Sequence, residues 1–407
     1  MTSPPPAAPD SDAPASRAVA PLYAAGFTTA FGAHSVAAGV GAQVGAAEGD
    51  IGAGLLALGV FLALYDLAEV VLKPVFGSLA DRIGPRPVIV AGLLGFAVAS
   101  AIGIAEAGPV LLAVARLGQG AAASAFSPAS SAAVARLAGT GTGRYFGRYG
   151  SWKSLGYAVG PLLGAGLILV GGLALLFGVL AGLALAVAVW AAVAVPRVAP
   201  LPRPRYTVAD LARQLLERSF LGPTAVLAAA TGSLGAAVGF LPAIASAAGL
   251  STVVSVGAVT MLAIAAALLQ PGVGRARDAG RLADRPAMAG GLLLIAVGVA
   301  AGAVAAAAAG IGAAVAVYAA ALLIGLGIAL VTPVAFAHLA DATPAERMGR
   351  TMGTAELGRE LGDAGGPLLV GAVASLAGIG WGLGVLAVAV GLTAASAPRS
   401  RADAPDA

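Results

Sequence analysis

Four charged residues near the end of the sequence have a spacing that permits proton chemistry. Glu356, Arg359, Glu360 and Asp363 lie at positions i, i+3, i+4 and i+7 of an otherwise apolar segment. On a helix they would form one arc of about 100°. Internal pairs, Glu356–Arg359 or Arg359–Asp363, are one interpretation. The alternative is that one carboxylate lacks a permanent partner and takes up protons, and we favour Glu360 or Asp363 for that role.

Asp66 is a second acid inside an apolar segment, fifteen residues after Ile51. A charge at the centre of a membrane helix costs about 2.5–3.5 kcal/mol on insertion scales, so an acid there needs a partner or a function. Asp66 is therefore a candidate proton-binding or substrate-binding residue. Glu69 and Lys73 follow Asp66 at i+3 and i+7 and so lie on the same face of a helix. We interpret them as a structural pair near the membrane boundary.

Two cations stand in other apolar segments. Arg116 follows Pro109 by seven residues, and Lys153 lies in the segment that begins near residue 146. Each could neutralise a buried acid or carbonyl, or take part in proton or substrate binding. The chain has no cysteine, and its two histidines, His34 and His338, are far apart, so we expect no metal site and no cofactor.

The composition is that of a membrane protein. Hydrophobic residues make up 59% of the 407 residues and charged residues only 10%, whereas soluble domains carry about 25% charge. A helix that crosses about 30 Å of hydrocarbon takes about 20 residues, so twelve spans fit the length. We expect helices near 18–41, 51–76, 87–106, 109–136, 146–170, 172–195, 219–247, 252–270, 286–307, 311–339, 347–377 and 379–397.

The distribution of basic residues sets the orientation of these helices. Every second connecting segment has no Lys or Arg and carries only the acids Glu48, Asp50 and Glu106, whereas the arginines gather in the remaining segments. Basic loops stay in the cytoplasm, so both termini are expected there, in an inner (plasma) membrane protein. The net charge of +4 then faces anionic lipid, and no nucleic-acid partner is expected.

The domain organisation follows from these segments. Residues 1–17 are rich in Pro, Ser and Asp and predict a disordered tail, and 398–407 form a C-terminal tail. Two six-helix bundles, 18–195 and 219–397, flank a cytoplasmic linker, 196–218. The linker has apolar residues on one side of a short helix from Val208 to Arg218, which suits a membrane surface. We expect a monomer.

The two bundles repeat each other. Residues 143–164 match 349–370 with an offset of 206 (350 − 144), so that Arg144, Gly156 and Lys153 correspond to Arg350, Gly362 and Arg359. Residues 77–86 have a weaker echo in 274–281. A six-plus-six duplication follows from this repeat.

With these halves and three motifs, the sequence resembles the major facilitator superfamily over residues 18–397. The first motif is a predicted loop between helices: Gly77, Asp81, Arg82, Gly84 and Arg86. The second is Arg116 with Gln119 and Gly120, and the third, similar to that of the proton-driven export branch, is Gly156, Gly160, Pro161 and Gly164. The resemblance implies that Asp81 docks on the helix starting near 347 and that Arg116 serves proton coupling. The third motif suits either a seal between the halves or plain helix packing.

The resemblance favours an exporter of a small amphipathic or drug-like compound, driven by proton antiport with alternating access. Small-molecule substrate, protons and the lipid bilayer are then its partners. The alternative is a symporter or facilitator that imports a nutrient or organic anion, with Arg116, Lys153 or Arg359 as the anion ligand. A membrane enzyme is disfavoured because the sequence has neither a GxSxG motif nor a P-loop. The short loops disfavour a signalling receptor.

Overall fold

The computed structural model describes residues 12–46, 51–105, 108–197 and 218–398. Within these ranges the chain is all-helical, with eleven α-helices and one short 3₁₀ helix, η1, and no strand. Most of the expected amphipathic helix at 208–218 and the C-terminal tail lie outside the described residues. The helices are α1 (Asp12–Ala46), α2 (Ile51–Ile83), α3 (Pro85–Ile104), α4 (Pro109–Leu137), α5 (Thr142–Ala194), α7 (Arg218–Ala247), α8 (Thr252–Asp278), α9 (Asp284–Ala305), α10 (Gly310–Ala342), η1 (Ala345–Arg347), α11 (Met348–Ala377) and α12 (Ile379–Ala394).

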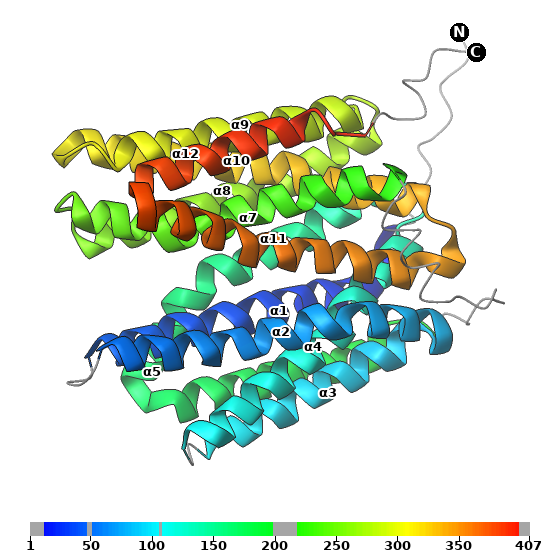
Figure 1. The fold of residues 1–407 in the computed structure, drawn as a ribbon. Coiled ribbons are helices and arrows are strands. Elements are labelled where there is room, and N and C mark those ends of the chain that lie inside the picture. Colours follow the sequence, from blue (N-terminus) through cyan, green and yellow to red (C-terminus); the bar gives the residue numbers. More distant parts are fainter. Residues whose placement is uncertain (1–11, 47–50, 106–107, 198–217, 399–407) are drawn as a thin grey trace, which may run out of the picture.

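The helices form two bundles that lie side by side (Figure 1), α1–α5 in one and α7–α12 in the other. We call them the N-half and the C-half. In the N-half α1 packs on α5 and α3 on α4, and in the C-half α7 packs on α11 and α9 on α10. The matching neighbours in the two halves agree with the internal repeat of the sequence.

Seven helices of the described chain are long and apolar enough to cross a membrane, judged by length and composition: α3, α4, α5, α7, α8, α9 and α10. This is a membrane protein. Large apolar side chains cover the outer faces of the bundles, among them Leu169, Val193 and Ile311, each more than four-fifths exposed. Such surfaces are stable in contact with lipid and not with water.

α5 contains a break where two helices were expected. Gly171 and Gly172 have non-helical backbone angles, and Gly172 has φ = 70°, which is strained for other residues. α5 is therefore two helical segments, 142–170 and 173–194, joined by a sharp turn at the position where the sequence predicts the end of one helix and the start of the next.

The end of α2 corrects the prediction of a loop. Gly77, Asp81 and Arg82 were expected between two helices, but α2 continues to Ile83, and only Gly84, at φ = 88°, separates it from α3. No proline interrupts this stretch before Pro85, which occupies the first turn of α3, where a missing N–H is harmless. α8 extends to Asp278 in the same way. α1 begins at Asp12 and so takes in part of the expected tail.

Glycines of the third motif pack inside the N-half. A Cβ on Gly156 would meet the Phe27 carbonyl oxygen at 2.8 Å, and Gly160 and Gly164 lie against α1 in the same way. Their repeat mates Gly362 and Gly366 lie against α7. These contacts are close helix packing within each half. A sealing role of this motif stays a prediction.

Candidate functional site

A buried ion pair joins the two halves. Lys73 on α2 is fully buried, and its Nζ lies 2.6 Å from Glu360 Oε1 on α11. The same nitrogen is 3.3 Å from Glu69 Oε2, one turn earlier on α2. The interpretation of Glu69 and Lys73 as a local pair was therefore incomplete, because the shorter contact of Lys73 crosses to the other half.

The repeat places a neutral hydrogen bond at the equivalent position. Gln270 on α8 donates from Nε2 to Ser154 Oγ on α5, at 2.8 Å. Gln270 is the repeat mate of Lys73 (270 − 73 = 197, as for Asp81 and Asp278), and Ser154 is the mate of Glu360 (360 − 154 = 206). One of the two symmetry-related contacts between the halves is thus charged and the other is neutral.

A second charged cluster adjoins the first. Glu356 on α11 is fully buried, and its Oε2 accepts from Lys153 Nζ at 2.8 Å and from Arg359 Nη1 at 3.2 Å. The Arg359 guanidinium also lies 5.8 Å from the centre of the Phe336 ring on α10. One carboxylate therefore serves a cation from each half. The predicted Glu356–Arg359 pair is present and takes in Lys153.

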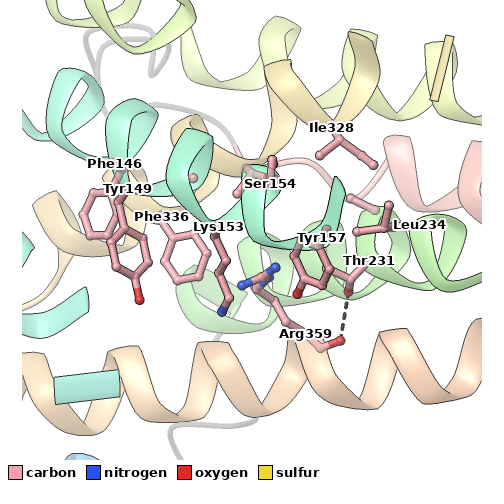
Figure 2. Close-up of a pocket in the computed structure, with 13 residues that line it drawn as sticks. Phe146, Tyr149, Lys153, Ser154, Tyr157, Thr231, Leu234, Ile328, Phe336 and Arg359 are labelled. Carbon is pink, nitrogen blue, oxygen red and sulfur yellow. Dashed lines mark hydrogen bonds between the residues drawn. The ribbon is translucent and has the colours of Figure 1, made fainter. Parts of the chain in front are cut away.

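A small pocket lies beside this cluster (Figure 2). Lys153 and Arg359 point into it from α5 and α11, and Thr231 on α7 donates from Oγ1 to the Arg359 carbonyl oxygen at 2.9 Å. Four aromatic rings line it: Phe146, Tyr149, Tyr157 and Phe336. The pocket is thus built from α5 of the N-half and α7, α10 and α11 of the C-half.

Two candidate acids have no hydrogen bond or ion pair among the described residues. The Asp66 side chain on α2 is exposed, and Asp363 on α11 is partly exposed with its Oδ1 facing Gly235 of α7. The predicted Arg359–Asp363 pair is not formed. No group of three or more acids or histidines in the described chain is placed to hold a metal ion.

Arg116 lies apart from these clusters, inside the N-half. It is buried, donates to Gln119 Oε1 at 3.0 Å and to the Gly32 carbonyl oxygen at 3.4 Å, and stacks 4.4 Å from the centre of the Tyr65 ring. These contacts hold the guanidinium against Tyr65, the residue before Asp66 on α2. His34 on α1 contacts the Ala30 carbonyl oxygen through Nδ1 at 3.0 Å.

The first motif forms a second connection between the halves. Asp81 accepts hydrogen bonds from the backbone N–H groups of Gly349 (2.7 Å) and Arg350 (2.9 Å) at the start of α11, and from Arg136 Nη2 of α4 (2.6 Å). A helix N-terminus favours an anion. In the C-half Asp278 accepts from the N–H groups of Gly143 and Arg144 at the start of α5, at 2.8 and 2.7 Å.

The two basic residues of that motif have different environments. Arg82 is exposed, whereas Arg86 donates to the Ala192 carbonyl oxygen at the end of α5. Gly84 supplies the positive φ of the turn, and Gly77 lies against the backbone of α11. Several residues of these connections were absent from the predicted site, among them Glu69, Lys73, Arg136, Ser154, Thr231, Gln270 and Asp278. For Lys73 and Gln270 the available signal was their place in the repeat.

A model of the Major Facilitator Superfamily matches residues 18–282, more than half of the chain. The chain belongs to the major facilitator superfamily. Members of this superfamily are transporters rather than enzymes, and they bind small-molecule substrates. The predicted family and the resemblance to its drug-exporter-like branch are confirmed.

Curated relatives of this superfamily match over a short region. Tetracycline resistance protein, class G, of Vibrio anguillarum is 40% identical over 109 residues, 26% of this chain and 27% of that protein. Puromycin resistance protein pur8 of Streptomyces alboniger is 38% identical over 105 residues, 25% of this chain and 21% of that protein. The chain thus spans about a quarter of the length of these relatives.

Two solved structures share the fold over nearly the whole chain. The human organic anion transporter MFSD10 (TETRAN) has a TM-score of 0.75 at 18% identity, covering 95% of this chain and 100% of that one. The Escherichia coli fucose:proton symporter FucP has a TM-score of 0.73 at 15% identity, covering 93% and 97%. At these identities the likeness shows the fold alone.

Proposed function

We propose that the protein exports a small amphipathic or drug-like compound by proton antiport with alternating access. It works as a monomer in the inner (plasma) membrane, with twelve crossings, both ends in the cytoplasm, and α5 crossing twice. The substrate site lies between the halves. The proton sites are among Asp66, Glu360 and Asp363.

The Lys73–Glu360 ion pair carries this proposal. The pair holds α2 to α11 at 2.6 Å inside the bundle, where a charge without a partner is costly. A proton on Glu360 removes the negative charge that attracts Lys73, and the link between the halves weakens. Within the described part of the chain Asp66 and Asp363 form no ion pair, so they can bind and release protons without breaking such a contact.

The remaining contacts between the halves give the cycle its two states. Asp81 and Asp278 join the halves at the end of the bundle that carries the basic loops. Two glycine crossings, of α2 on α11 at Gly77 and of α5 on α8 at Gly143, join them at the same end. With that end in the cytoplasm, the described arrangement is closed to the cytoplasm. Protons enter from the outside, release the Lys73–Glu360 pair, and the inward-open state takes up substrate.

Export is favoured over import by the relatives. Several matching proteins are named as tetracycline or puromycin resistance proteins, so these two compounds are reasonable first probes. The alternative of a symporter or facilitator for an organic anion has one specific observation in its favour, which is that Lys153 and Arg359 both line the pocket between the halves.

The proposal is tested in proteoliposomes with a pH-sensitive dye inside and an imposed pH gradient. Tetracycline or puromycin moving against the proton flux supports antiport, and movement with the protons supports the symport alternative. Asp66→Asn, Glu360→Gln and Asp363→Asn are each compared with Glu346→Gln, an acid of η1 outside the buried clusters. At least one of the three is expected to abolish coupled proton flux, and Glu346→Gln is expected to preserve it.

Two results contradict the proposal. Transport without any proton flux would exclude coupling, and coupled flux that survives neutralisation of all three acids together would exclude these residues as its carriers. A susceptibility screen of cells that express the chain, with tetracycline and puromycin among the compounds, extends the search for the cargo.

A further inference from the structure

The pocket between the halves has cations with unused hydrogen-bonding capacity. Lys153 and Arg359 are both buried, 3% and 5% exposed, and both bond to the same oxygen of Glu356. An arginine has five N–H donors and a lysine three. Among the described residues Arg359 Nε is buried without a hydrogen-bond partner, as are several other side-chain atoms, Glu356 Oε1 of the same cluster among them. A buried donor without a partner calls for an explanation, and an acceptor on a bound ligand is one.

The charged residues that line the pocket have one sign. Lys153 and Arg359 line it, and no acid of the described chain does. Their charges are balanced outside the lining by Glu356 and by the adjoining cluster of Lys73 with Glu69 and Glu360. An anionic ligand in the pocket would therefore meet two cations directly, whereas a cationic ligand would be placed against both of them.

The walls of the pocket favour a flat apolar body. Phe146 and Phe336 stack with ring centres 5.4 Å apart, and Tyr149 and Tyr157 stand on the same side of α5 as Lys153 (Figure 2). Aromatic side chains pack well against other rings in stacked or edge-to-face arrangements. Charged groups and rings therefore meet in one pocket, with Thr231 beside them.

We propose that the transported compound is an amphipathic organic anion, with an aromatic body held by these rings and an acid group held by Lys153 and Arg359. This inference rests on the proposed transport function and names the substrate class for it. Lys153 and Arg359 are repeat mates on opposite halves (359 − 153 = 206), so an anion bound to both connects the N-half to the C-half.

The described arrangement is too tight for such a compound. The pocket encloses about 20 Å³, which is room for one water molecule. Binding therefore requires α5 to move away from α10 and α11, which are the helices of the opposite half. The ligand thus selects a more open arrangement of the two halves.

The test uses three probes with the same ring system: naphthoate (anion), naphthamide (neutral) and naphthylmethylammonium (cation). Binding to the purified protein in detergent is measured by equilibrium dialysis, without any gradient. Naphthoate is expected to bind at least about tenfold more tightly than naphthamide, the effect of a charge-assisted hydrogen bond. The ammonium is expected to bind most weakly.

Lys153→Gln is the decisive variant, because Glu356 keeps Arg359 as its partner while the pocket loses one of the two cations that line it. It should weaken naphthoate more than naphthamide and so remove the preference for the anion. Phe336→Leu keeps all charges and should weaken naphthoate and naphthamide by the same factor.

Three results overturn the inference: equal affinity for the anion and the amide, preference for the ammonium, or no binding of any probe up to its solubility. The outcome is independent of proton coupling. An anion preference in detergent with no coupled flux in proteoliposomes would keep this inference and reject antiport, and coupled export of a cation would do the reverse.

Discussion

Lys73 and Gln270 occupy equivalent places in the two halves but use different chemistry. The Lys73–Glu360 contact requires two charges to be removed from water, and such a pair is often no more stable than an apolar replacement. Gln270 and Ser154 connect the halves without that cost. Structural support alone does not explain why one contact is charged. The proposed role of Glu360 in proton binding would explain the charge of this contact.

Lys73→Met and Gln270→Met form a matched pair for testing this difference. Lys73→Met removes the cation that contacts the buried Glu69 and the partly buried Glu360, and it should lower the free energy of unfolding by about 3–5 kcal/mol. Gln270→Met removes one neutral hydrogen bond and should cost about 1 kcal/mol. Thermal unfolding in detergent at neutral pH measures both.

The difference in stability between these two variants should also depend on pH. Protonated carboxyl groups need no cation, so the gap between the two variants should shrink as the pH falls. Equal losses at neutral pH, or a gap that does not change with pH, would contradict a charge-dependent role for Lys73. In that case the Lys73–Glu360 pair is only a structural contact.

Residue spacing predicted part of this site. The intervals among Glu356, Arg359 and Glu360 placed them on one helical face, and the repeat placed Lys153 level with Arg359. The contact of Lys73 with Glu360 spans 287 residues of sequence. Spacing along a helix reaches only to i+7 or so, and it assigned Lys73 to Glu69 instead. Only the packing of α2 on α11 selects the partner.

The crossing of α2 and α11 depends on glycine. A Cβ on Gly77 would come within 2.5 Å of the Gly349 carbonyl oxygen, and Gly353 faces the same stretch of α2. The equivalent crossing of α5 and α8 places Gly143 against Gly274. Since backbones meet directly at both crossings, a single methyl group must push the halves apart at this end.

Gly77→Ala should therefore favour the state that is open on the side of the basic loops. The chain has no cysteine, so Ser154→Cys, a buried position, can report access to the interface. Its labelling by a membrane-impermeant maleimide in inside-out vesicles should speed up about fivefold, the effect of about 1 kcal/mol. Gly182→Ala, where a Cβ meets nothing within 4 Å, is the control and should not change the rate. An unchanged rate in Gly77→Ala would show that the crossing tolerates the methyl group.

The sequence located the helices well and their ends less well. Apolar runs place every helix, because lipid-facing residues must be apolar over the full span. The last turns of α2 and α8 were assigned to loops because they are polar, but Asp81 and Asp278 are there held by the N-termini of α11 and α5. Polar residues in these turns are helical because a partner from the other half binds them.

The whole molecule is a duplicated unit whose two copies meet at matched contacts. The hydrogen bonds of Asp81 to α11 and of Asp278 to α5 are one matched pair. The glycine crossings are another, and Lys73–Glu360 and Gln270–Ser154 are the third. The first two pairs are chemically alike in both copies. The third is alike in position and different in charge, and the proposed proton coupling uses only its charged copy.

The number of membrane crossings is the last point to test, and α5 decides it. If α5 crosses twice, with its turn at Gly171 and Gly172, Val170 lies on the outer face and Arg197 on the cytoplasmic face. Both residues are exposed, and Val170 has a repeat mate in the exposed Leu376. Since the chain has no cysteine, single cysteines at 170, 197 and 376 can each be labelled separately.

In intact cells an impermeant maleimide should label Val170→Cys and Leu376→Cys but not Arg197→Cys. In inside-out vesicles the pattern should reverse. Arg82→Cys, at the exposed end of α2, is the control for the cytoplasmic face. Labelling of 170 and 197 from the same side would mean that α5 does not cross twice. The arginines of the linker would then lie outside, contrary to the charge distribution that basic loops follow.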